Sequence, residues 1–325
     1  MIGPADDFLI HQTHEPVRHV QTSDRRFYDR YFFTGHACSE DLFFMLGMGN
    51  YPNLGVIDAF ASVACGGQQV TTRASRELGI DRLDTANVGP FGVEVVEGLR
   101  RLRLWARPSA QKIHFDLEWN GAVPAFEEPP LFMRTLGRVI EQGTRLIQTG
   151  HWSGYIAVGE RRFELAAACA WGARDRSWGV RSIGFEREPR GIQQAHAQNE
   201  QRTPLWIWSP MQFKDYSIHF SVGEYASGER AIETVRRVTS FAQGGAIEEL
   251  GGATHDLKFD LATRELEAGS RVGFMDRDGS RRSVTLEPLC RAYLRAGTGY
   301  GGPDAWRHGM YSGYRLGQFA GIRPD

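Results

Sequence analysis

The stretch GARDRSWGVR, residues 172–181, places one aspartate among arginines and a tryptophan in a segment otherwise rich in strand-forming residues. Successive side chains of a β-strand point to opposite faces, which predicts Arg174 and Trp178 on one face and Asp175 on the other. Burial in apolar surroundings raises the pKa of an aspartate, which can then donate a proton to an unactivated double bond. Asp175 is therefore the candidate acid. The alternative is an aspartate that pairs with an arginine and fixes a corner between two sheets.

The candidate partner of this acid is His151, in the segment TGHWSGYIAVG. His151 lies 24 residues before Asp175, a separation that one hairpin can fold into contact between adjacent strands. The next residue, Trp152, would then point to the other face of its strand. We expect a pair between His151 and Asp175, with a purely structural strand histidine as the alternative.

A segment near the C-terminus, residues 299–317, combines glycines with Trp306, His308 and Tyr311. Aromatic rings stabilise a nearby cation through their negative faces, by about 1–2 kcal/mol for a well-placed, desolvated ring. We predict that this segment closes a ligand pocket; the alternative is a strand that docks by aromatic packing. The rings predicted to stabilise a carbocation are those of Trp152, Trp178 and Trp306.

A second interpretation makes the protein a carrier or sensor of a hydrophobic small molecule. Arg174 and Arg181 would then hold a ligand carboxylate, and Asp175 would only orient them. An aspartate in that role has a lowered pKa, because nearby cations favour its charged form. The titration of Asp175 therefore distinguishes the acid from the orienting residue.

The elements that position these residues are predicted to be β-strands. Short aromatic and β-branched runs recur between Gly, Pro or Asn, and several alternate polar with apolar residues, as in RRLRLWARP at 100–108. This pattern is typical of antiparallel meanders, so we predict an all-β fold of two tandem barrels. One short helix is expected at 129–143, where prolines precede apolar residues at helical spacing.

A chain of 325 residues with 41% hydrophobic content predicts two domains. The polar, glutamine-rich stretch at 186–204 interrupts the strand pattern and serves as the predicted linker. We therefore expect an N-terminal domain at 1–190 and a smaller C-terminal domain at 191–325. In the second domain, DRDG at 276–279 predicts a hairpin turn.

Composition excludes several classes of partner. A formal net charge of −1 provides no field that would attract nucleic acid. No stretch approaches 18 consecutive apolar residues, and the acidic N-terminal start is unlike a signal peptide, so we expect a soluble cytoplasmic protein without a membrane segment. The expected partner is a lipophilic small molecule. The sequence leaves the oligomeric state open.

Metal and cofactor motifs are also missing from the sequence. Its four cysteines form no CxxC pair, which indicates neither a zinc ribbon nor a redox motif. His11 and His14 have metal-like spacing but no third ligand nearby. Neither a phosphate-binding loop nor a GxSxG elbow occurs. We therefore expect no metal and no cofactor.

Four segments together resemble a known family: YFFTGHACSEDLFFMLGMGNYPNLGVIDAFASV, GHWSGYIAVG, GARDRSWGVR and AWRHGMYSGY. They are similar to the tandem-lipocalin proteins of the AttH and carotenoid 1,2-hydratase (hydroxyneurosporene synthase) type, in a bacterial branch, over most of the chain. The resemblance implies two calycin-like β-barrels with a ligand cavity near their junction. In the hydratase branch it implies cofactor-free, acid-catalysed addition of water to an isoprenoid double bond.

The same resemblance maps the acid onto Asp175 and an upstream histidine onto His151. The hydratases carry an aromatic residue where this chain has Ala173. We predict cofactor-independent hydration, cyclisation or isomerisation of an isoprenoid- or terpenoid-like alkene near the domain junction. The residues expected to bind this substrate are Trp152, Arg174, Trp178, Arg181, Trp306, His308 and Tyr311.

Overall fold

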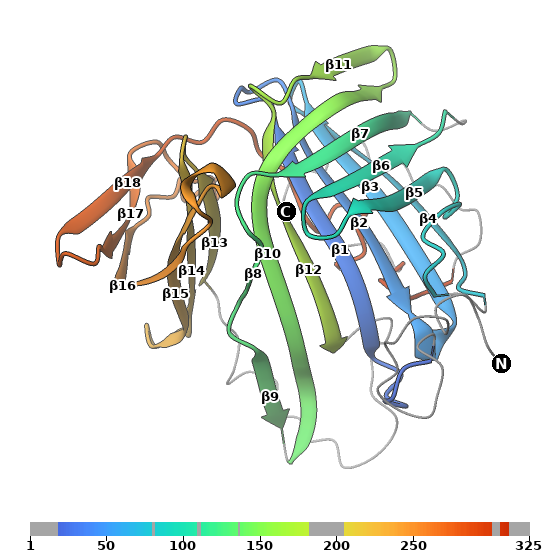
Figure 1. Cartoon of the computed structure of the whole chain (residues 1–325), viewed down its shortest axis with the longest axis horizontal. Coiled ribbons are helices and arrows are strands. Elements are labelled where there is room, and N and C mark those ends of the chain that lie inside the picture. The colour runs from blue at the N-terminus through green and yellow to red at the C-terminus, as the bar shows by residue number, and fades with distance from the viewer. Residues whose placement is uncertain are drawn as a thin grey trace.

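The fold is built almost entirely from antiparallel β-strands (Figure 1). The structure is a computed structural model, and it describes residues 19–79, 82–108, 112–135, 137–181, 205–300 and 306–311. Within these ranges it contains two short 3-10 turns, η2 (Pro52–Leu54) and η3 (Phe241–Gln243), and no α-helix. The predicted all-β class, with two curled antiparallel sheets in tandem, is confirmed.

The first sheet has twelve strands and curls around its own core. Nine strands follow the order β4-β3-β2-β1-β12-β10-β7-β6-β5, and the other three pair with β10. Because β4 and β5 are the two ends of this order, the described strands form an open curl and not a closed barrel. The strands are β1 (Phe27–His36), β2 (Phe43–Tyr51), β3 (Val56–Cys65), β4 (Gln68–Glu77), β5 (Phe91–Glu97), β6 (Arg101–Ala106), β7 (Ile113–Gly121), β8 (Phe126–Glu127), β9 (Leu131–Thr135), β10 (Arg138–Val158), β11 (Arg161–Leu165) and β12 (Trp171–Val180).

The core of the first sheet lies on its inner face. Strand β6 follows the predicted alternation, with Leu102 and Leu104 buried and Arg101 and Arg103 exposed. Three aromatic side chains from β1, β7 and β10 form the centre of this core, with ring centroids 5.0 to 6.1 Å apart. They are Phe33, Trp119 and Trp152, all fully buried.

The helix predicted at 129–143 is wrong, because this segment forms β9 and the start of β10. The two strands pair directly, with Phe132 opposite Gln142. Gly137 lies in the turn between them with a φ of +78°, a left-handed conformation that glycine adopts without strain and that ends a right-handed helix. Pairing of β10 with its neighbours therefore outweighs the helical spacing of the apolar residues.

The second sheet is a meander of six strands in sequence order. The DRDG turn is confirmed: the Asp276 N–H donates to the Ser280 carbonyl at 2.9 Å, and Gly279 has a φ of +79°. The strands are β13 (Leu205–Gln212), β14 (Tyr216–Glu224), β15 (Arg230–Thr239), β16 (Ile247–Asp256), β17 (Ser270–Met275) and β18 (Arg281–Leu286).

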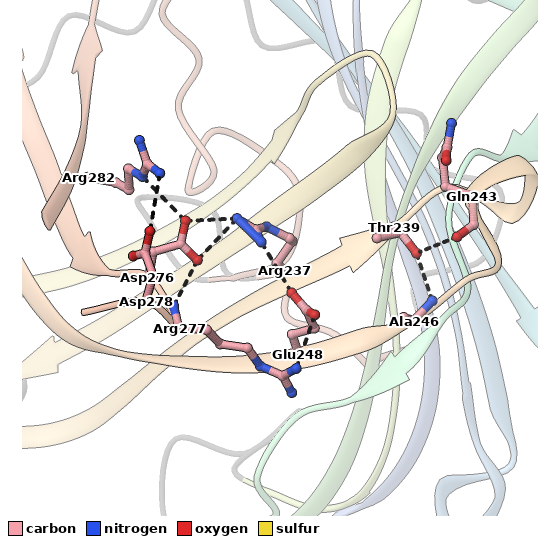
Figure 2. A network of polar contacts seen from close by, with 9 residues as sticks. All are labelled: Arg237, Thr239, Gln243, Ala246, Glu248, Asp276, Arg277, Asp278 and Arg282. Carbon is pink, nitrogen blue, oxygen red and sulfur yellow. Dashed lines mark hydrogen bonds and ion pairs between the residues drawn. The ribbon is translucent and has the colours of Figure 1, made fainter. Parts of the chain in front are cut away.

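Ion pairs join the end of β15 to the strands that follow it (Figure 2). Arg237 contacts Asp276 at 3.0 Å and Glu248 at 3.3 Å, and Arg282 also contacts Asp276, at 3.3 Å. Thr239 accepts the Ala246 N–H at 2.7 Å in the connection between β15 and β16. Pairs near the surface contribute about 0–1 kcal/mol each, so this network adds modestly to the backbone pairing of the strands.

The two sheets contact each other through polar and apolar side chains. His219 of β14 lies 2.7 Å from Glu128, which precedes β9. Thr149 of β10 donates to Gln212 of β13 at 2.5 Å. An apolar cluster at the same contact contains Val123, Phe126, Ile147 and Val238. The predicted domain boundary at residue 190 falls outside the described residues and stays a prediction.

The segment after β18 returns to the first sheet and covers the outer face of β3 and β4. Gln69 accepts the Tyr293 N–H at 2.6 Å and donates to the Tyr293 carbonyl at 2.9 Å. Thr71 donates to the Ala296 carbonyl at 2.8 Å. We call residues 287–300 and 306–311 the C-terminal segment. The described part of this segment forms no strand, and it docks through these hydrogen bonds.

A buried charged group anchors the end of this segment. The Nδ1 of His308 lies 3.5 Å from an Asp58 oxygen, which also accepts the Gly309 N–H at 3.0 Å and lies 3.4 Å from Arg73. Burial lowers the pKa of His308. Burial opposes ionisation of Asp58 as well, but the contacts with His308 and Arg73 and the more distant charge of Arg30 lower its pKa overall. Asp58 is therefore ionised and His308 neutral at pH 7.

We expect this histidine to make the protein sensitive to acid. Below pH 6.5 the unfolded chain protonates His308 and the folded chain does not, so stability is lost as the pH falls. Between pH 7 and pH 5, the wild type should lose about 2 kcal/mol of unfolding free energy relative to His308→Gln. Urea denaturation at both pH values measures this. His114→Gln, on β7, is the control, and equal losses in wild type and His308→Gln would contradict the prediction.

Candidate functional site

A cavity of about 1400 Å³ lies between the two sheets. Its walls come from β1, β2, β9, β10 and β12 of the first sheet, from β13 to β15 and β18 of the second, and from the C-terminal segment. The volume exceeds the roughly 300–1,000 Å³ of ordinary small-molecule sites, which leaves room for an extended ligand. Most of its walls are apolar or aromatic, including Phe32, Met45, Phe132, Trp171, Trp206, Trp208, Met211, Phe213 and Leu294.

Asp175 lines this cavity. It lies on β12 between Phe32 of β1 and Ile147 of β10, and its side chain is half-buried. No hydrogen bond or ion pair joins the Asp175 carboxyl to another described residue. Burial raises its pKa to about 6, although Arg145, Arg30 and Arg181 act in the opposite direction. A carboxyl with this pKa is partly protonated near neutral pH and can donate a proton.

The two arginines on either side of Asp175 point to the other face of the sheet. Arg174 is buried and donates to Gln148 at 2.8 Å, and burial lowers its pKa to about 10. Arg176 pairs with Asp29 and lies 4.6 Å from the centre of the Tyr31 ring. The motif therefore supplies structural cations to the inner face and an acid to the cavity.

The structure does not bring His151 and Asp175 together. Strand register places Trp171 opposite His151 and Ile147 opposite Asp175, so the two residues are four positions apart along the strand pair. At a rise of about 3.3 Å per residue, this offset is about 13 Å. His151 instead contacts the Ala167 carbonyl at 3.0 Å, and its ring lies 3.9 Å from that of Trp171. These contacts are those expected of the alternative, a structural strand histidine, which stays a prediction.

The other predicted ligand contacts lie mostly away from the cavity. Trp152 is in the core of the first sheet, and Trp178 is on the inner face of β12, opposite Asp29. Trp306 stacks over Arg73, with 4.3 Å between the guanidinium carbon and the ring centre. His308 is held against Asp58, and Tyr311 is 61% exposed. Of the predicted binding residues, Arg181 alone lines the cavity.

Sequence analysis missed several charged residues of the cavity. Arg30 of β1, Glu141 and Arg145 of β10, and Tyr300 of the C-terminal segment all line it. Burial raises the pKa of Glu141, against the effects of Arg181 and Arg145. Arg145 pairs with Glu128, whose other oxygen contacts His219. The position of Arg30 within the aromatic run FYDRYFF, at 27–33, is the feature of the sequence that could have indicated a functional role for it.

Comparison with known proteins gives a family but no activity. A family model described as a family of unknown function matches residues 2–317. The chain belongs to DUF8625. No curated protein sequence matches this member of DUF8625 significantly. In the described part of this DUF8625 chain, no helix is long and apolar enough to cross a membrane.

Two solved structures resemble this DUF8625 chain. One is a provisionally assigned AttH of Nitrosomonas europaea, 11% identical, which covers 76% of this chain and 77% of that chain with a TM-score of 0.49. The other is CghA with Sch210972, 12% identical, which covers 81% and 76% with a TM-score of 0.44. The function proposed below rests on this chain's own residues.

We expect Asp175→Asn to stabilise the protein at pH 8. Burial raises the pKa of Asp175 in the folded protein above its value in the unfolded chain, so the ionised carboxylate destabilises the fold. This destabilisation is complete above pH 6 and decreases as the pH falls toward 4. Allowing for partial solvent access, the gain should be about 2 kcal/mol at pH 8 and smaller at pH 4.5. Thermal or urea denaturation measures it. Asp116→Asn, at an exposed ion pair with Arg103, should give no gain; an equal gain at both pH values would contradict the prediction.

Proposed function

We propose that the cavity binds a lipophilic alkene and that Asp175 protonates it. The observation that supports this most directly is the position of Asp175: a carboxyl without a hydrogen-bond partner among the described residues, with a pKa of about 6, in a largely apolar cavity. A neutral carboxylic acid in such a site is a general acid that needs no metal or nucleotide. The volume of the cavity and its aromatic and aliphatic walls suit an isoprenoid-like compound.

The proposed reaction begins with transfer of the Asp175 proton to one alkene carbon. The O–H bond breaks, a C–H bond forms, and the products are a carbocation and the Asp175 carboxylate. In a hydration, water adds to the cation and returns its surplus proton to Asp175. In an isomerisation, the proton returns from the adjacent carbon instead, and in a cyclisation a second double bond attacks the cation before that proton leaves. Each route regenerates the acid.

The rings available to the cation are not those expected from the sequence. In place of Trp152, Trp178 and Trp306, the cavity offers Phe32, Trp171, Trp206 and Trp208. Trp206 and Trp208 lie on the same face of β13 and would form one wall of the substrate site. Their negative faces support a positive charge that develops within the cavity.

The alternative is a carrier that binds without conversion. It is favoured by Arg30 and Arg181, which line the cavity without a carboxylate partner among the described residues and would hold an anionic ligand equally well in a carrier. Here Arg30 replaces Arg174 of the sequence-based prediction, because Arg174 points to the inner face. Turnover distinguishes the carrier from the enzyme.

The proposal is tested on small molecules that co-purify with the protein from its native host. Incubation with wild type should convert the extracted compound, whereas Asp175→Asn should bind it and lose at least about 100-fold in rate, the usual contribution of a general acid. The wild-type rate should also fall as the pH rises above about 6, because the protonated acid is lost. Mass spectrometry of the extract before and after incubation measures conversion.

Asp116→Asn is the matched control, since it removes an exposed carboxylate and leaves the cavity unchanged. Its rate should equal that of the wild type. Turnover that survives in Asp175→Asn would rule out Asp175 as the acid. A bound compound that returns unchanged from the wild type would identify a carrier.

A further inference from the structure

Arg30 is a buried cation without a carboxylate partner among the described residues. It points from β1 into the cavity and is only 2% exposed. Its one hydrogen bond is from Nη1 to the Tyr300 hydroxyl at 3.2 Å, and its Nε has no hydrogen-bond partner. Burial of a charge is costly unless opposite charges or hydrogen bonds compensate it. Asp58 and Asp175 favour the charge of Arg30 from a distance, but neither contacts it, so its guanidinium keeps donors available for a ligand anion.

Arg181, directly after β12, lies at the same end of the cavity. Its guanidinium carbon is 4.5 Å from the centre of the Tyr28 ring and 5.6 Å from that of Tyr300. The guanidinium of Arg30 is 4.9 Å from the same Tyr300 ring. Arg181 forms no ion pair with a described residue, whereas the third arginine of the cavity, Arg145, is paired with Glu128. Two unpaired guanidinium groups therefore flank one tyrosine.

These cations also affect the proposed chemistry. A carbocation that forms beside Asp175 would be repelled by Arg30 and Arg181, because like charges in a desolvated site are screened poorly. The same two arginines favour the ionised form of Asp175, which cannot donate a proton. An anion bound between them would remove both effects at once.

We infer that Arg30 and Arg181 bind a carboxylate of the substrate, which makes the substrate class a lipophilic carboxylic acid whose double bond reaches Asp175. The planar fork of a guanidinium matches the two oxygens of a carboxylate, and charge-assisted hydrogen bonds of this kind are short and strong. This inference rests on the proposed function, because it concerns the same cavity.

Charge balance in the cavity leads to a second consequence. The ionisable groups that line the cavity with Asp175 are Arg30 and His36 on β1, Arg145 and Glu141 on β10, Arg181 after β12, Glu128 before β9, Glu233 on β15, the thiols of Cys38 and Cys290, and the hydroxyls of Tyr28 and Tyr300. Glu233 is paired with Arg230. Arg145 and Glu128 already neutralise each other. A ligand carboxylate bound to Arg30 and Arg181 would neutralise the two charges that favour ionised Asp175. Its binding should therefore raise the pKa of Asp175 and be accompanied by uptake of a proton on that residue.

The binding test uses cis-parinaric acid, a conjugated-polyene fatty acid, and its methyl ester, with the fluorescence of the probe as the readout at pH 7. Wild type should bind the acid at least about tenfold more tightly than the ester, since a charged hydrogen bond contributes at least this factor. Arg181→Gln should abolish the preference and leave ester affinity unchanged. Arg30→Gln should also abolish the preference for the acid, provided that thermal denaturation shows this variant to be folded. Arg103→Gln, exposed on β6, should retain the preference.

The proton test compares binding of cis-parinaric acid by calorimetry in buffers of different ionisation enthalpy. Wild type should take up a fraction of a proton at pH 7, and Asp175→Asn should take up none. Equal wild-type affinity for acid and ester would overturn the carboxylate site and leave the lipophilic cavity standing. A parallel loss of both affinities in Arg181→Gln would also overturn the carboxylate site. Failure of both probes to bind would overturn the proposed function as well. Proton uptake that persists in Asp175→Asn would show that Asp175 is not the group that takes up the proton, and would overturn its assignment as the acid.

Discussion

Strand β12 separates two compartments, and its alternating side chains serve both. Its central position between β1 and β10 fixes the register, so that Phe32 and Ile147 flank Asp175 on the cavity side. On the opposite face, Arg174 bonds to Gln148 and Arg176 pairs with Asp29, and both contacts hold the strand against the core. A shift by one residue would exchange the faces and place a guanidinium where the acid now lies. The cavity chemistry therefore depends on the register of one strand.

The acid is kept in its protonatable form by a balance of opposing effects. Burial favours the neutral carboxyl, and three arginines favour the charged one, with the net result a pKa of about 6. Burial makes the larger contribution, although the arginines are also buried or half-buried. Such a site costs folding stability, because neither the carboxylate nor Arg30 has an oppositely charged contact among the described residues. Sites that bind ligands commonly carry this cost in the free protein.

Local sequence patterns predicted the features that depend on local geometry. The period of two in RDRSW assigned Asp175 and Arg174 to different faces, and the DRDG turn and the all-β class followed from similar short-range signals. The helix at 129–143 failed because apolar spacing cannot reveal that Gly137 forms a turn between paired strands. The pair of His151 with Asp175 failed because a hairpin brings strands together without specifying their register. Arg30 with Tyr300 could not be inferred, since 270 residues separate them along the chain.

The C-terminal segment gives the cavity an order of assembly. Leu294 and Tyr300 form part of its wall, and the residues between and beside them dock on β4, through Thr71 with Ala296 and Gln69 with Tyr293. Tyr300 itself contacts Arg30 and Phe32 of β1. The strands of the first sheet precede those of the second along the chain, but the outer face of β3 and β4 is covered by residues that follow both sheets. Closure of contacts this distant in sequence is slow compared with hairpin formation. The wall of the cavity is therefore completed only by residues far along the chain from the strands of the first sheet that form its other side.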